Sequence, residues 1–133
     1  MKRRSAWALF AGFLLVVVLS LGTDQALHML GIYPPWSERM SDAMFAVATA
    51  YRLVYGIAGS YLTARLAPSR PMAHALVGAA IGTLLATAGA AATWDRGPEF
   101  GPHWYPVTLI VTGLPCAWVG ATLARREITQ PHD

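Results

Sequence analysis

Three ionisable side chains interrupt otherwise apolar stretches of this sequence: Asp24, His28 and Arg52. An ionisable group inside a bilayer is costly, so such a residue is by default a pairing partner or a functional group. Asp24 and His28 lie four residues apart, which places them on one face of a helix. The three side chains could therefore form an ion pair, hold a small ligand or relay protons.

Arg52 and Asp24 are expected to meet at the same depth. Arg52 lies about 15 Å along a helix that starts near Asp42 on the outer side. Because helical side chains lean toward the N-terminus, its guanidinium points outward, toward Asp24. We expect His28 or the hydroxyls of Tyr51 and Tyr55 to complete this intramembrane polar cluster. A buried ion pair that fixes helix register is the first interpretation, and a ligand-binding or proton-relaying pocket is the alternative.

A second set of candidates, Trp94, Asp95, His103 and Trp104, lies around the loop between the third and fourth apolar stretches. Tryptophans at such positions are typical of an interfacial aromatic belt. An outer aromatic rim that binds a ligand is the alternative interpretation.

Histidines and carboxylates on the outer side raise the question of a metal or haem. His28 and His103, with Asp24, Asp95 and Glu99 nearby, include the ligand types that metals and haem accept. However, the sequence has no HxxxH, HExxH or CxxCH pattern. We expect no cofactor, and a membrane metal or haem protein remains the second functional alternative.

Patterns typical of enzymes are missing from the sequence. It contains no GxSxG, P-loop or GxGxxG motif, and its one cysteine, Cys116, lies in an apolar stretch and cannot form an intramolecular disulfide. We therefore expect no enzymatic activity.

Composition indicates what must position these residues. The 133 residues are 55% hydrophobic but only 13% charged, with a mean hydropathy of +0.41. Soluble domains carry about 25% charged residues, so a soluble enzyme is excluded. The net charge of +3 comes from basic residues at segment ends rather than on one face, which argues against nucleic-acid binding. Membrane lipids are the expected surroundings.

Four apolar stretches predict an all-α integral membrane four-helix bundle, a single transmembrane domain over residues 1–133. Each stretch has enough residues to cross a hydrocarbon core of about 30 Å, and none alternates as a barrel strand does. Prolines and glycines mark the connections between them. Ser37 or Ser41 could cap the second helix. The predicted spans cover residues 6–29, 43–66, 72–94 and 105–124.

Basic residues predict the orientation. Seven of them gather on one side: Lys2, Arg3, Arg4, Arg65, Arg70, Arg125 and Arg126. The opposite side has Arg39 and Arg96 among several acidic residues. The positive-inside rule therefore places both termini in the cytoplasm. A cleaved signal peptide is the competing interpretation of the N-terminus, but its apolar run is longer than the usual 7–15 residues.

Small residues recur every fourth position in three of the stretches, as close helix packing in lipid requires. These stripes are Gly56, Ser60 and Ala64; Gly78, Gly82, Ala86 and Ala90; and Gly113, Ala117 and Ala121. Residues 56–67 also align without gaps to residues 113–124. A duplicated two-helix hairpin and a chance match of small residues both explain that alignment.

Several short stretches together resemble a family of small, uncharacterised bacterial inner-membrane proteins with four spans. The resemblance implies the bacterial cytoplasmic membrane and four helices, and it assigns no site residue. The stretches are Gly22-Thr23-Asp24-Gln25, Pro34-Pro35-Trp36, Ala50-Tyr51-Arg52, residues 63–68, Arg70-Pro71-Met72 and residues 101–106.

These observations favour a small accessory or interaction protein without chemistry of its own. Its partner would be another membrane protein or a second copy of the chain. The alternative is a small transporter or channel component that uses a polar site around Arg52, Asp24 and His28.

Overall fold

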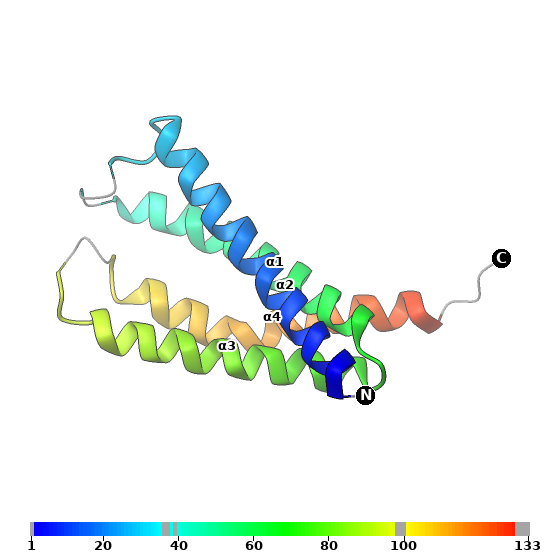
Figure 1. The fold of residues 1–133 in the computed structure, drawn as a ribbon. Coiled ribbons are helices and arrows are strands. Elements are labelled where there is room, and N and C mark those ends of the chain that lie inside the picture. The colour runs from blue at the N-terminus through cyan, green and yellow to red at the C-terminus, as the bar shows by residue number, and fades with distance from the viewer. Residues whose placement is uncertain (1, 36–37, 39, 98–100, 130–133) are drawn as a thin grey trace.

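The computed structural model describes residues 2–35, 38, 40–97 and 101–129. Within these ranges the chain forms four helices and no strand: α1 (Lys2–Met29), α2 (Asp42–Leu66), α3 (Pro71–Thr93) and α4 (Trp104–Thr129). They make a four-helix bundle built of two hairpins, α1–α2 and α3–α4 (Figure 1). The predicted fold class is confirmed, while the duplication of a hairpin stays a prediction.

Most helix ends lie within one residue of the predicted spans. The exceptions are α1, which begins at Lys2 rather than residue 6, and α4, which ends at Thr129 rather than residue 124. The apolar run marks the part of a helix that suits lipid, whereas lysine and arginine continue a helix well beyond it. Ser41 caps α2, and its hydroxyl oxygen accepts from the backbone N–H of Met44 at 3.3 Å. Ser37 lies outside the described residues.

Three helices, α1, α3 and α4, are long and apolar enough to cross a membrane. The sequence predicted four such spans, and α2 does not meet this criterion. The reason is visible in its composition, because α2 carries Asp42, Arg52 and Arg65 together with three tyrosines. Its 25 residues are nevertheless long enough to cross a hydrocarbon core at 1.5 Å per residue.

Backbone contact at glycines joins α1 to α2. A Cβ atom added to Gly12 would lie 2.6 Å from the carbonyl oxygen of Gly59, and one added to Gly59 would lie 2.8 Å from that of Gly12. Beside them, the Thr63 hydroxyl donates to the carbonyl oxygen of Ala8 at 3.0 Å. Side chains at these two glycine positions would force the helices apart. Small residues thus let the two backbones approach as lipid-embedded helices require.

α2 lies against all three other helices and contacts α4 most extensively. A Cβ atom at Gly120 of α4 would lie 2.4 Å from the carbonyl oxygen of Ile57, so these two backbones also touch. Toward the end of the bundle where α1 begins, called the inner end below and opposite to the outer end at the α1–α2 connection, a buried cluster closes the space between α2, α3 and α4. Its members are Ala64, Ala75, Ala121 and Ala124, with Tyr61 and Met72 packed against them.

The small-residue stripe of α3 does not pack along its whole length. The Cβ of an alanine at Gly78 would lie 3.2 Å from a methyl carbon of Leu9, a contact so tight that the leucine side chain would have to shift, so Gly78 lies close against α1. At Gly82, one turn further, nothing lies within 4 Å of that position. Beyond this point α1 leans away from α3 (Figure 1). The predicted stripe is therefore a packing face at its inner end and the wall of an open space further out.

We expect Gly12→Ala to destabilise the bundle by about 1–3 kcal/mol, because the added methyl group overpacks the α1–α2 contact. Gly22→Ala is the matched control on the same helix, since nothing lies within 4 Å of its added Cβ. That change should be neutral or slightly stabilising through helix propensity. Unfolding in mixed detergent micelles measures both. Equal stabilities for the two variants would contradict the Gly12–Gly59 contact.

Candidate functional site

Asp24 and Arg52 form an ion pair between α1 and α2. The Arg52 Nη2 donates to Asp24 Oδ2. The pair is well shielded, with 21% of the arginine side chain and 11% of the aspartate side chain exposed. Each charge thus offsets the other where neither could stand alone in lipid. The contact expected from helix depth and side-chain direction is present.

Tyrosine hydroxyls complete the pairing of this carboxylate. The Tyr51 hydroxyl donates to Asp24 Oδ1, so both oxygens of Asp24 accept from α2. The Tyr33 hydroxyl lies 3.3 Å from both the Tyr51 hydroxyl oxygen and the carbonyl oxygen of Met44. Tyr33 itself is buried, although it belongs to the connection after α1. The cluster is therefore a network that joins α1, the following loop and α2.

Aromatic rings also surround the guanidinium. Its Cζ lies 5.4 Å from the centre of the Tyr51 ring and 5.8 Å from that of Tyr105, the second residue of α4. Both distances suit a cation–π contact. The polar cluster predicted from the sequence did not include Tyr33 or Tyr105. Both residues are tyrosines placed at the same end of the chain's predicted helices as Asp24, and this was the feature of the sequence that could have predicted their contact with the cluster.

His28 and Tyr55 have other partners. His28 Nδ1 donates to the carbonyl oxygen of Pro34 at 2.6 Å, and its ring meets that of Tyr33 edge-on at 5.2 Å. Tyr55 and Thr23 share a hydrogen bond of 2.6 Å between their hydroxyl oxygens. The structure thus brings Tyr51 to Asp24, as expected, but uses Tyr55 for a second α1–α2 contact and His28 to hold the loop.

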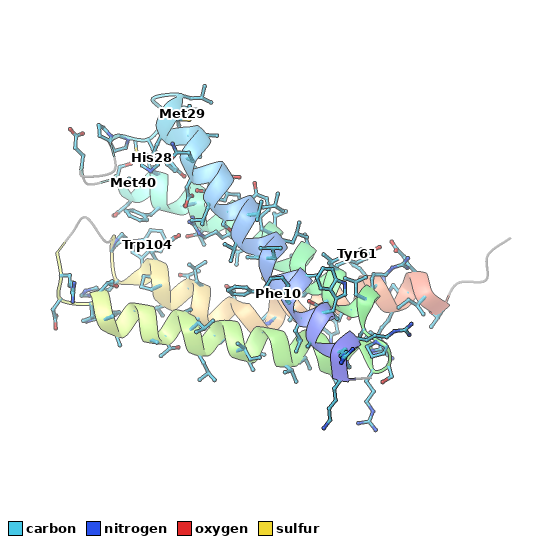
Figure 2. All side chains as sticks on the ribbon, viewed as in Figure 1. Phe10, His28, Met29, Met40, Tyr61 and Trp104 are labelled. Atoms are coloured by element: carbon cyan, nitrogen blue, oxygen red, sulfur yellow. The ribbon has the colours of Figure 1, made fainter. Side chains whose placement is uncertain are left out.

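An outer pocket of about 180 Å³ opens beside this network. Figure 2 shows His28 and Met40, from its wall, at the same end of the bundle as Trp104, with Tyr61 toward the other end. The wall combines two carboxylates, one guanidinium and three aromatic rings. Its residues are Asp24, His28, Tyr33, Glu38, Met40, Phe45, Ala48, Arg52 and Tyr105.

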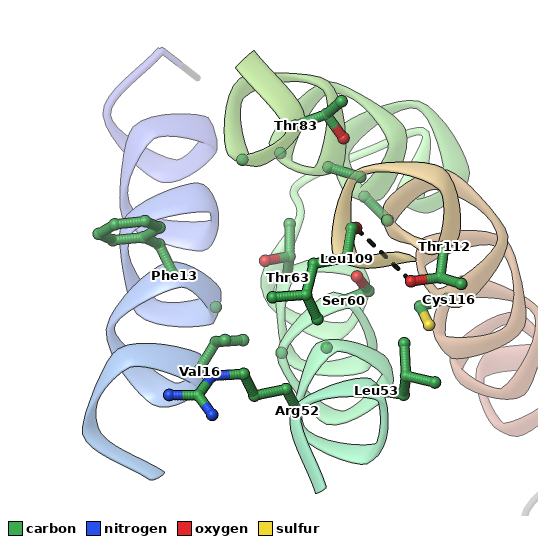
Figure 3. Close-up of a pocket in the computed structure, with 18 of the residues that line it drawn as sticks. Phe13, Val16, Arg52, Leu53, Ser60, Thr63, Thr83, Leu109, Thr112 and Cys116 are labelled. Atoms are coloured by element: carbon green, nitrogen blue, oxygen red, sulfur yellow. Dashed lines mark hydrogen bonds between the residues drawn. The ribbon is translucent and has the colours of Figure 1, made fainter. Parts of the chain in front are cut away.

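A larger central cavity of about 290 Å³ lies on the inner side of Arg52 and has walls from all four helices (Figure 3). Small and apolar residues dominate its lining. They include Leu9, Gly12 and Val16 of α1; Leu53, Gly56 and Gly59 of α2; Gly78, Ala79 and Gly82 of α3; and Leu109, Gly113 and Cys116 of α4. Arg52 lines both cavities and so stands between them.

The outer-rim candidates form a smaller arrangement of their own. The rings of Trp94 and His103 stack with centres 3.7 Å apart, and His103 Nε2 donates to the carbonyl oxygen of Trp94 at 3.0 Å. Trp104 meets Tyr105 edge-on at 6.3 Å. Asp95 lies exposed just beyond α3. These contacts close the α3–α4 connection and tie it to the ring beside Arg52.

A metal or haem finds little support in the placement of its proposed ligands. Within the described ranges, no group of three or more histidine, cysteine or acidic side chains could hold a metal ion. His28 and His103 each donate one ring nitrogen to a backbone carbonyl oxygen. Glu99 lies outside the described residues.

Comparison of this chain with family models, with curated proteins and with solved structures finds no match. Functional conclusions rest on the geometry.

We expect Asp24→Leu and Arg52→Met each to cost about 3 kcal/mol, because each leaves an unpaired charge in the bundle. The double variant should recover at least about 1 kcal/mol relative to the sum of the two, since it leaves no lone charge. Unfolding in mixed micelles gives this double-mutant cycle. Asp95→Leu, the same aspartate change at an exposed position, serves as the control and should have little effect. Additive effects of Asp24→Leu and Arg52→Met would refute the energetic coupling of the pair.

Proposed function

We propose that the chain is a four-span protein of the bacterial cytoplasmic membrane that acts as an accessory protein without chemistry of its own. One observation carries this proposal: Arg52 and Asp24 pair with each other, and the Tyr51 hydroxyl donates to the remaining oxygen of Asp24. Such a fully paired arrangement stabilises the alignment of two helices and leaves neither charge for a substrate. The partner would be another membrane protein or a second copy of the chain, met through apolar helix faces. Membrane lipids are its surroundings.

The pairing of Arg52 supports counting α2 as the fourth span. Arg52 is the charge that lies mid-helix, and Asp24 neutralises it from α1. Asp42 and Arg65 lie at the two ends of α2, where charges reach the interface.

Charge distribution supports cytoplasmic termini. The first residues of α1 and the connection between α2 and α3 lie at the same end of the bundle (Figure 1). Lys2, Arg3, Arg4 and Arg70 belong to that end, which the positive-inside rule assigns to the cytoplasm. The resemblance to four-span bacterial inner-membrane proteins implies the cytoplasmic membrane as the location.

A small transporter or channel component is the second candidate. The observation that favours it is the position of Arg52 on the walls of both cavities. An ion pair at such a constriction would separate an outer pocket from a central one. Opening the pair would then join them.

Cysteine labelling tests the four-span topology. In a Cys116→Ser background, Glu38→Cys and Ser69→Cys place single thiols beyond the two ends of α2. We expect an impermeant maleimide to label the Glu38→Cys protein in intact cells, and the Ser69→Cys protein only after permeabilisation. Labelling of both in intact cells would mean that α2 does not cross, and the reverse pattern would invert the orientation.

The accessory role predicts a complex that survives removal of the charge pair. After mild extraction from its host membrane, native mass spectrometry should find the protein with a second subunit at fixed stoichiometry. The Asp24→Leu/Arg52→Met protein should retain that subunit, because the pair is structural. A bare monomer, or a solute flux in proteoliposomes that only the wild-type protein supports, would contradict the accessory role. The flux would favour the transporter candidate.

A further inference from the structure

The two cavities differ in chemistry on either side of one residue. Outside Arg52, the outer pocket presents carboxylates and aromatic rings. Inside Arg52, the central cavity presents mainly glycines, alanines and aliphatic side chains (Figure 3). A polar pocket next to an apolar cavity suits an amphiphile, which has a polar head group and a hydrocarbon chain.

The size of the central cavity suits one hydrocarbon chain. Its 290 Å³ is about twice the ~150 Å³ of an engineered apolar cavity that binds benzene. It is also at the lower limit of ordinary ligand pockets. A space of this volume suits one hydrocarbon chain better than the two chains of a phospholipid.

The sparsest contact between packed helices around this cavity is that between α1 and α3. These two helices contact each other least among the packed pairs. Their contacts near the start of both helices include the hydrogen bond of 2.8 Å from Ser5 to His74 and the approach of Leu9 to Gly78. Further out α1 leans away, and Gly82 faces open space (Figure 1). A chain can therefore enter sideways from the lipid and point toward the Leu9–Gly78 contact.

The charged residues of the outer pocket determine which polar head group it would bind. Among the described residues, two carboxylates line the outer pocket, Asp24 and Glu38, with one guanidinium, that of Arg52, which Asp24 already pairs. Glu38 is therefore the carboxylate left to attract a ligand, and Tyr33, Phe45 and Tyr105 line the same pocket. Aromatic rings beside a carboxylate recognise substituted ammonium groups. Within the described part of the wall, an anionic head would meet the unpaired Glu38 and no unpaired lysine or arginine.

We propose that the two cavities form one binding site for a single-chain amphiphile with an ammonium head, taken up from the bilayer between α1 and α3. The head occupies the outer pocket near Glu38, and the chain passes Arg52 into the central cavity. This site does not depend on the accessory role, because a partner protein contacts the outer faces of the helices.

Cys116 provides the test, since it lines the central cavity and is the one cysteine in the sequence. The probe is decyltrimethylammonium, added below its micelle concentration to protein in nanodiscs, and the readout is the alkylation rate of Cys116. We expect the probe to slow alkylation at least threefold. Tetramethylammonium, which lacks the chain, and decanoate, which has an anionic head, should not protect at equal bilayer concentration. Protection by decanoate equal to that by the probe would overturn the head assignment.

Two matched substitutions test the location. Gly82→Leu places a side chain in the cavity, and nothing lies within 4 Å of its added Cβ. Gly89→Leu is the matched control on α3, because its added Cβ is equally free of contacts but Gly89 does not line the cavity. Gly82→Leu should abolish protection, and Gly89→Leu should retain it. Glu38→Gln should weaken protection, with Asp95→Asn as its charge control. Equal protection in the Gly82→Leu and Gly89→Leu proteins would overturn the proposal.

A measurement on the unaltered protein covers the case in which Gly82→Leu fails to fold. A photoreactive group at the end of the probe's chain should label residues near Leu9 and Gly78, at the inner end of the cavity. Labelling confined to lipid-facing side chains such as Leu84, which is 70% exposed, would overturn the proposal.

Discussion

A guanidinium in the middle of α2 is the constraint on which this bundle depends. Lipid cannot solvate Arg52, so α1 must present a carboxylate at the matching height, and Asp24 does so. That requirement fixes how far α1 slides along α2. The same register brings Gly12 opposite Gly59 and Thr63 to the carbonyl of Ala8, two turns or more from the charges. One electrostatic requirement and one steric one thus agree on a single alignment of the two helices.

The second role of Arg52 comes from its place between two spaces. Its chain leaves α2 toward α1, and its guanidinium forms part of the wall of both cavities (Figure 3). Tyr51 of the same helix and Tyr105 of α4 contact the guanidinium through their rings rather than through further charges. A polar compartment and an apolar one therefore meet at a group that carries no net charge once it is paired.

Sequence alone was sufficient for what depends on depth and periodicity. The proline-bounded apolar runs predicted most helix ends to within one residue, though not the start of α1 or the end of α4, and the lean of helical side chains predicted the contact of Arg52 with Asp24. The sequence was insufficient to predict contacts that depend on the angles at which the helices cross. Tyr33 reaches the cluster from a loop, and Tyr105 reaches it from a helix remote in sequence, so no local spacing connects either to Asp24. The open side of Gly82 depends on the angle between α1 and α3, which a stripe of small residues does not encode.

The composition of α2 has a consequence for biogenesis. α2 falls short of the apolarity that lets a helix partition into lipid by itself, because its central arginine lacks a counter-ion within the same helix. That counter-ion comes from α1, which is synthesised first. On the proposed four-span topology, α1 would wait beside the translocon until α2 emerges, and the two helices would enter the bilayer as a pair. The ion pair between them would then form before α3 and α4 are synthesised.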